Sequence, residues 1–142
     1  MTVVIDASVA LKWYVTEADS AAARAIFASE HDLIAPELVV AEVSNASWKL
    51  LRRGELDRTQ HVRIAQEIGE MLSWLVPLRQ LVPRAAVLAH ELDHPVYDCF
   101  YLALSEAEDA PLVTADRRLI AKVAGTPFAA RTLHLSAAAA RG

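Results

Sequence analysis

The chain has 142 residues and a mass of 15.5 kDa, which suits one domain with a proper hydrophobic core. Hydrophobic residues make up 54% of it, yet no apolar run approaches the roughly 18 residues that a membrane span needs. The apolar content is above the usual range for soluble domains, and it therefore indicates a buried helical scaffold or a subunit interface. One cysteine excludes an internal disulfide and any multi-cysteine zinc site.

The formal net charge is −4, from 14 basic and 18 acidic residues, whereas proteins that bind nucleic acid normally carry a basic surface. This balance argues against broad electrostatic binding of nucleic acid. It leaves room for a metal-bridged phosphate site, because four carboxylates committed to a metal would leave equal numbers of acids and bases. The amino terminus has no basic segment or cleavage-site pattern, so we expect no secretory signal and a cytoplasmic location.

Short apolar runs alternate with helical spacing over the first half of the chain. Residues 3–5 are β-branched, as is typical of a buried parallel strand, and a second short run stops at Pro36. Ser8 suits the N-cap of the first helix, Gly54 the end of the third and Asp57 the N-cap of the fourth. The elements expected here are helices at residues 9–15 and 18–28, a strand at 33–35, and helices at 37–53 and 57–72.

The alternation continues through the second half. The elements expected are a strand at residues 76–78, a helix opened by Pro83 and reaching residue 92, a helix at 97–108, a strand at 112–114, a helix at 117–123 and a strand at 130–135. Pro77 places the first of these strands at a sheet edge, and the tail at about 136–142 is expected to be frayed. The pattern predicts a single α/β domain over residues 1–142, a parallel sheet covered by helices on both faces.

Large side chains in the helices complete the expected core. Trp48, Trp74 and the aromatic residues of the helix at 97–108 are expected to fill it. The helix at 57–72 is expected to bury a stripe that includes Val62 and Ile68.

Four carboxylates are the candidate functional residues. Asp6 ends the first strand, Asp116 follows the strand at 112–114, and Asp98 and Glu42 lie early in two helices. Ligands of open α/β sheets lie beyond the carboxyl ends of the strands, so we expect these side chains to share one pocket. Carboxylate oxygens are the ligands that hard divalent cations such as Mg²⁺ prefer.

Each acid also has an ordinary interpretation. Asp6 and Asp116 are able to cap the following helices, Asp98 to interact with a helix dipole, and Glu42 to be a solvated surface residue. The coincidence of all four favours the metal site. Asp98 and Glu42 are also flanked by apolar residues, and buried acids need a partner.

Cys99, beside Asp98 and five residues after His94, suggests a thiol nucleophile as another possibility. Cys99 lies in a run of large apolar residues, where a free cysteine usually packs in the core. The packing interpretation is therefore favoured.

Four segments resemble a known family: residues 4–8 (Val-Ile-Asp-Ala-Ser), 36–45, 97–104 (Tyr-Asp-Cys-Phe-Tyr-Leu-Ala-Leu) and 112–119. Together they resemble the PIN-domain family and, within it, the VapC toxins of bacterial toxin–antitoxin pairs, from residue 1 to about 120. The resemblance implies a Rossmann-like sheet and an endoribonuclease that uses Mg²⁺ or Mn²⁺ to hydrolyse RNA. It also implies a homodimer that is neutralised by a VapB-type antitoxin. No membrane partner is expected, because the chain has no apolar run long enough to span a bilayer.

The residues that match the family's catalytic and metal-binding acids are Asp6, Glu42, Asp98 and Asp116. Small polar residues stand beside them, expected to orient a ligand or a water, with helix capping as the alternative: Ser8, Asn45 and Thr114. Some relatives place a further acid after the last aspartate, whereas this chain has Arg117 and Arg118, so the number of metal ions stays open.

Basic residues near the acids are candidates for binding RNA phosphates. The first candidates are Arg117, Arg118 and Lys122, next to Asp116, and the alternative for each is a solvated helix face. The secondary candidates are Lys12, Trp13, Lys49, Arg52 and Arg53. Glu42, Asn45 and Lys49 share one helix face by their spacing.

Two other classes of function remain to be weighed. One is a PIN fold with a silent site that only binds RNA or protein, which the retention of all four acids disfavours. The other is a phosphoryl-transfer domain, which requires a second acid close to Asp6. This chain has Ala7 and Ser8 there, so the required pair of acids is missing.

Overall fold

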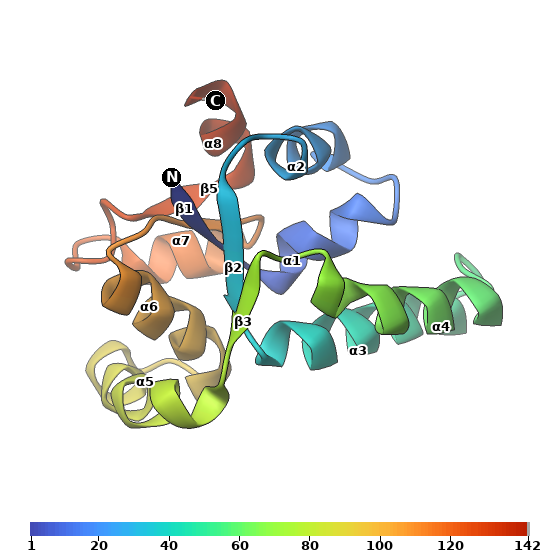
Figure 1. Cartoon of the computed structure of the whole chain (residues 1–142). Coiled ribbons are helices and arrows are strands. Elements are labelled where there is room, and N and C mark those ends of the chain that lie inside the picture. The colour runs from blue at the N-terminus through green and yellow to red at the C-terminus, as the bar shows by residue number, and fades with distance from the viewer. Residues whose placement is uncertain (142) are drawn as a thin grey trace.

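The computed structural model describes residues 1–141 and contains one five-stranded sheet with helices on both sides (Figure 1). Its elements in chain order are β1 (Thr2–Ile5), α1 (Ala7–Ala10), the 3₁₀ helix η1 (Leu11–Trp13), α2 (Ser20–Phe27), β2 (Asp32–Pro36), α3 (Leu38–Arg52), α4 (Arg58–Glu67), the 3₁₀ helix η2 (Ile68–Glu70), β3 (Trp74–Val76), α5 (Leu78–Leu92), α6 (Val96–Glu108), β4 (Leu112–Thr114), α7 (Arg117–Val123), β5 (Thr132–His134) and α8 (Leu135–Arg141). The predicted α/β class is confirmed. No described helix has both the length and the hydropathy required to cross a bilayer.

The sheet is parallel throughout, in the order β3-β2-β1-β4-β5. Val4 of β1 pairs with Ile34 of β2 on one side and with Leu112 of β4 on the other. The chain leaves β1 through β2 and β3, then returns to the opposite side of β1 as β4. Connections therefore diverge between β1 and β4, and a crevice is expected at the carboxyl ends of these two strands.

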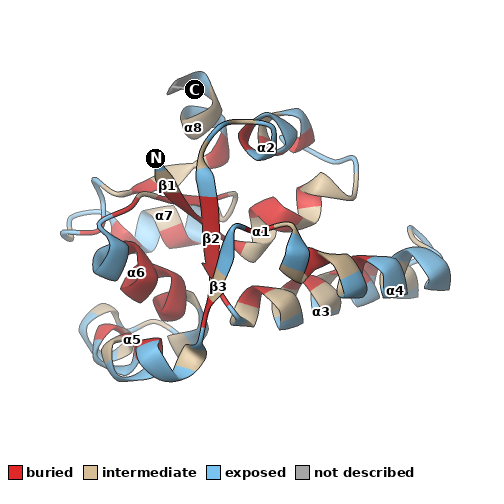
Figure 2. Cartoon of the chain, viewed as in Figure 1, coloured by how far each residue is buried: buried red, intermediate tan, exposed pale blue. Residues whose placement is uncertain are grey.

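The core lies around β1 and α6. Val4 and Ile5 are fully buried, and α6 is buried all round from Cys99 to Ser105 (Figure 2). A helix that is apolar on every side packs between other elements rather than along a surface. In this fold α6 lies between the sheet and α5. Asp98, in its first turn, is therefore carried by a helix that is anchored in the core.

Several expected element boundaries are wrong. Ser8 lies inside α1, whose N-cap position is taken by Asp6. Pro83 lies in the second turn of α5, which begins directly after Pro77. Packing of the first turn through buried Leu81 outweighs the backbone hydrogen bond that a proline removes.

The helix expected at 57–72 also differs from the observed one. It ends at Glu67 and continues as the 3₁₀ helix η2, and the strand expected at 76–78 lies at Trp74–Val76, although at the predicted sheet edge. Val62 is 51% exposed, and Ile64 faces the core in its place. The prediction that Val62 belongs to the buried stripe is therefore wrong, while Ile68 is buried as predicted.

Both tryptophans expected in the core lie at the surface. Trp48 is 44% exposed beneath the guanidinium of Arg52, and Trp74 on the edge strand is 41% exposed. Tyr97 is exposed too, whereas Phe100 and Tyr101 are buried as expected.

The tail expected to fray forms α8 as far as Arg141, and Gly142 lies outside the described residues. Leu135 of α8 is fully buried, Ala138 packs against the core, and the helix contacts α2. Tertiary packing stabilises a helix too short to persist alone in water.

Candidate active site

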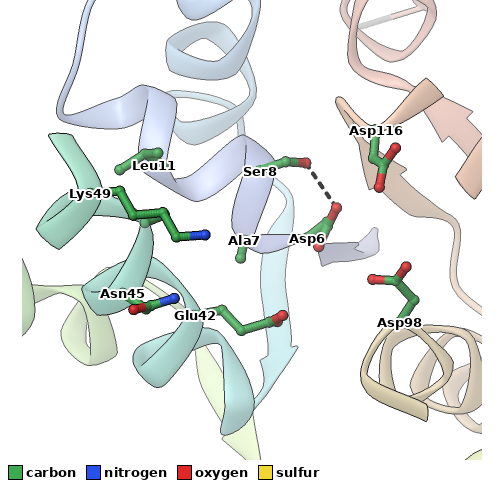
Figure 3. Close-up of a pocket in the computed structure, with 10 residues that line it drawn as sticks. Asp6, Ala7, Ser8, Leu11, Glu42, Asn45, Lys49, Asp98 and Asp116 are labelled. Atoms are coloured by element: carbon green, nitrogen blue, oxygen red, sulfur yellow. Dashed lines mark hydrogen bonds between the residues drawn. The ribbon is translucent and has the colours of Figure 1, made fainter. Parts of the chain in front are cut away.

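All four candidate acids line one open pocket of about 320 Å³, together with Ser8, Asn45 and Lys49 (Figure 3). Asp6 comes from the end of β1, Glu42 from α3, Asp98 from α6 and Asp116 from the residues after β4. The pocket lies at the switch point of the sheet, and the predicted convergence of the four side chains is confirmed.

Asp6 is the most buried of the four, with 7% exposure. Its Oδ2 accepts hydrogen bonds from Thr114 Oγ1 at 2.6 Å and from Ser8 Oγ at 2.8 Å. These two hydroxyls in turn accept from the backbone N–H groups of Asp116 and Ala115, both at 3.0 Å. Two short side chains thus tie β1 to β4 and fix one carboxylate oxygen.

The pKa of the Asp6 carboxyl is raised because burial disfavours its charged form. Hydrogen bonds from Thr114 and Ser8 oppose that rise, and the negative charge of Asp98 adds to it. Among the side chains described, those of residues 1–140, no cation forms an ion pair with Asp6.

Glu42 is held by Tyr101, whose hydroxyl donates to Glu42 Oε1 at 2.6 Å. Burial raises the pKa of Glu42 to about 7; the bond from Tyr101 opposes the rise, and the charges of Asp6 and Asp98 add to it. Tyr101 was not identified as a site residue from sequence. The available signal was a tyrosine in an apolar run one turn after Asp98, because a buried hydroxyl needs a partner.

Asp98 pairs with His94, which lies in the loop just before α6, and the distance from Asp98 Oδ2 to His94 Nε2 is 2.6 Å. The histidine weighed as a partner for a thiol thus faces a carboxylate. Cys99 is buried, and burial raises its pKa to about 11, so the thiol is protonated and unreactive at neutral pH. The packing interpretation of Cys99 is confirmed.

Asp116 has two roles at once. Its Oδ1 caps α7 by accepting from the backbone N–H groups of Arg118 at 2.9 Å and Leu119 at 3.4 Å. The ordinary capping interpretation is therefore correct for Asp116, and the same residue lines the pocket.

The cations are placed differently from expectation. Arg117, Arg118 and Lys122 are exposed on α7 and are not among the residues that line the pocket. Lys12 is buried, with its Nζ 3.0 Å from Glu17 Oε1 and 2.7 Å from the carbonyl oxygen of Ala18, so it is not available to RNA. Lys49, only a secondary candidate, lines the pocket.

The donor set suits a hard divalent cation. It consists of carboxylates, and the pKa values of Asp6 and Glu42 are raised, first by burial and further by the charges of neighbouring acids. Over residues 1–141, no three His, Cys, Asp or Glu side chains are grouped closely enough to hold an ion in the conformation seen. The residues therefore fit a metal chemically, in an open pocket rather than a closed cage.

The model of the PIN domain family matches residues 3–125, most of the chain. The chain belongs to the PIN-domain family. Its relatives include ribonuclease VapC3 of Pyrobaculum aerophilum, 32% identical over 124 residues that cover 86% of this chain and 95% of that protein. The predicted membership of the VapC-type group is confirmed.

Two further comparisons agree. VapC ribonuclease Mb0985 of Mycobacterium bovis is 32% identical over 117 residues, which cover 82% of this chain and 87% of that protein. The crystal structure of PAE2754 from Pyrobaculum aerophilum has the same fold, with a TM-score of 0.67 and 23% identity over 99% of this chain and 88% of that one.

Proposed function

We propose that this VapC-type PIN domain is an endoribonuclease toxin that hydrolyses RNA phosphodiester bonds with Mg²⁺ or Mn²⁺. The relatives named as ribonucleases support the reaction class. The observation that carries the proposal is the pocket itself, where carboxylates from four separate elements meet at the carboxyl edge of the sheet. A purely structural role would not require four acids in one pocket, two of which, Asp6 and Glu42, have pKa values raised first by burial and further by neighbouring carboxylates.

Asp6, Glu42, Asp98 and Asp116 would hold the metal. When bound, a divalent ion lowers the pKa of a coordinated water and neutralises charge developing on the phosphate. Ser8 and Thr114 orient Asp6 through Oδ2 and leave its other oxygen free, and Tyr101 does the same for Glu42 through Oε1. Preorganised ligands of this kind bind a cation with little rearrangement of their own.

Proton removal from the attacking water falls to Asp98 or Asp116, each of which has one carboxylate oxygen outside the hydrogen bonds described above. Attack by water does not require the ribose 2′-hydroxyl. The products are therefore expected to carry a 5′-phosphate and a 3′-hydroxyl, with no cyclic phosphate.

Arg117, Arg118 and Lys122 project from α7 into solvent directly after Asp116. In this proposal they bind phosphates of the RNA outside the pocket. Such exposed contacts contribute to affinity and to its salt dependence rather than to the chemical step.

The relatives' VapC names support a VapB-type antitoxin that neutralises the enzyme as a partner in the same proposal. A homodimer is proposed from the resemblance of the sequence to the VapC toxins. An acidic pocket is a receptor for an inserted arginine, whose planar fork matches a carboxylate. The cytoplasm, where such a toxin meets cellular RNA, is the proposed location.

The test is cleavage of a mixed single-stranded RNA pool by the wild-type chain, Asp6→Asn and Asp98→Asn, with Asp32→Asn as an exposed matched control. We expect cleavage with Mg²⁺ or Mn²⁺, none with EDTA, and at least a 100-fold loss in both pocket variants. Thermal melts check that each variant is folded. Cleavage that persists in EDTA or in both pocket variants would refute the proposal, and an inactive wild-type chain that still binds RNA would favour the silent binding module.

A further inference from the structure

The polar face of α3 continues out of the acid pocket. Glu42, Asn45 and Lys49 are spaced three and four residues apart, and all three line the same pocket (Figure 3). At about 1.5 Å per residue, Lys49 lies roughly 10 Å from Glu42 along the helix axis. Its amine points into the pocket from the wall opposite Asp98 and Asp116.

Lys49 lies beside the acids of the pocket and forms no ion pair with any of them. In the part of the chain that the structure describes, no carboxylate lies within ion-pair distance of its Nζ, whereas Lys12, Arg63 and Arg84 are each paired with a glutamate. Of the described residues that line the pocket, Lys49 is the one cation. A protein with a net charge of −4 thus places a free ammonium beside its group of acids.

An ammonium in this place is complementary to a phosphate and not to the metal. Its three N–H groups are donors without a lone pair, so it is unable to be a metal ligand. Asn45 lies between it and Glu42, with an amide that forms no hydrogen bond among the contacts of the described residues. The stripe thus offers a metal-ligand carboxylate, a neutral hydrogen-bonding group and a cation in a row.

Resting on the proposed ribonuclease function, we propose that Lys49 binds the backbone phosphate next to the scissile one, with Asn45 contacting the nucleotide between them. The RNA strand then lies across the pocket along α3, from the acids towards the carboxyl end of the helix. Lys49 is in this account a substrate-positioning residue, which sets the register of the strand and takes no part in the chemical step.

The experiment measures cleavage of a single-stranded oligonucleotide that the wild-type chain cuts once, selected from a mixed RNA pool. The variants are Lys49→Met, which keeps the length and removes the charge, Lys49→Arg, which keeps the charge, and Arg24→Met as an exposed control on α2, outside the pocket. Rates are measured against RNA concentration at several KCl concentrations.

We expect Lys49→Met to raise KM about 10-fold with kcat nearly unchanged, because a charge-assisted contact made equally in ground and transition states is lost. The slope of log(kcat/KM) against log[KCl] falls by about 0.7, the value for one phosphate contact on a single strand. Lys49→Arg should keep the wild-type KM and the wild-type salt slope. Arg24→Met is expected to leave KM within about twofold, since Arg24 is exposed on α2 and is not among the residues that line the pocket.

A second arm locates the contact. Oligonucleotides carry one uncharged methylphosphonate, either immediately 5′ or immediately 3′ to the scissile phosphate. One of the two oligonucleotides should raise the KM of the wild type by the same factor as the Lys49→Met substitution does. The same oligonucleotide should not raise the KM of Lys49→Met further, because the methylphosphonate and the substitution remove the same interaction. Equal sensitivity of the wild type and Lys49→Met to both oligonucleotides, or an unchanged salt slope in Lys49→Met, would overturn the inference. An inactive wild-type chain would refute the ribonuclease proposal instead.

Discussion

At the residue scale, short polar side chains decide how the acids of the pocket are presented. Asp6 is fixed by two hydroxyls that are themselves fixed by backbone N–H groups, and Glu42 is fixed by a tyrosine hydroxyl from the core. In each acid, one carboxylate oxygen accepts hydrogen bonds from neighbouring hydroxyl groups. The position of the remaining oxygen therefore depends on neighbours that do not themselves face the pocket.

Tyr101→Phe tests this dependence. The substitution removes the donor to Glu42 and leaves the ring buried, so the concentration of Mn²⁺ needed for half-maximal cleavage should rise about 10-fold. Tyr14→Phe is the matched control, because the Tyr14 hydroxyl is buried without a partner in the described part of the chain. If the two variants require the same Mn²⁺ concentration, Tyr101 has only a packing role.

The raised pKa of Glu42 predicts an unusual pH dependence of stability in EDTA. Its pKa is raised from 4.5 to about 7 by burial, so between these values the folded state binds more protons than the unfolded state. The free energy of unfolding should therefore fall as pH rises from about 5 to 8, by about 1 kcal/mol once partial exposure is allowed for.

Urea unfolding at pH 5 and pH 8 measures this effect. Glu42→Gln should be more stable than the wild type at pH 8 and show a flatter pH profile, whereas exposed Glu108→Gln should keep the wild-type profile. A wild-type protein that gains stability over this range would show that Glu42 is not held in a charge-disfavouring site.

Sequence predicts the acids better than it predicts their partners, for a physical reason. Asp6 and Asp116 follow strands, so topology alone places them at one edge of a parallel sheet. Tyr101 of α6 reaches Glu42 of α3 only in the folded chain, and His94 reaches Asp98 from the loop before α6, whose course the sequence does not specify. Sequence proximity to Asp116 favours the α7 cations over Lys49, yet in the fold Lys49 is the cation that lines the pocket.

At the scale of elements, local chemistry predicts helix starts where the cap is a side chain. Asp57 was predicted as an N-cap, and it forms a capping box in which Gln60 N–H donates to its Oδ1 at 2.7 Å and its own N–H donates to Gln60 Oε1 at 2.8 Å. α5 shows the opposite case. It begins after Pro77 without a side-chain cap, and the later Pro83 was mistaken for its start.

Asp57→Ala should lower the free energy of unfolding by about 1 kcal/mol, because two backbone groups at the start of α4 lose their partners. Chemical denaturation measures the change, and RNA cleavage should be unaffected, since α4 contributes no residue to the pocket. Asp57→Asn, which keeps an N-cap side chain, should recover most of the loss. A loss of cleavage in a fully folded Asp57→Ala protein would connect α4 to function in a way this account does not contain.

At the scale of the whole molecule, the strand order determines where the pocket lies. β1 and β4 are neighbours whose connections run in opposite directions, and the acids at their ends face the resulting crevice. Alternating apolar runs and helical patterns were enough to predict this architecture. They did not predict α8, because its stability comes from contacts with α2 and β5 rather than from its own sequence.

The central claim is that the four acids act together as a divalent-cation site. Calorimetric titration of Mn²⁺ into the wild-type chain, Asp98→Asn and the exposed control Asp32→Asn tests it most directly. We predict saturable binding by the wild type and the control, with affinity at least 10-fold weaker in Asp98→Asn. Equal affinity in all three proteins, or no binding by the wild type, would contradict the account.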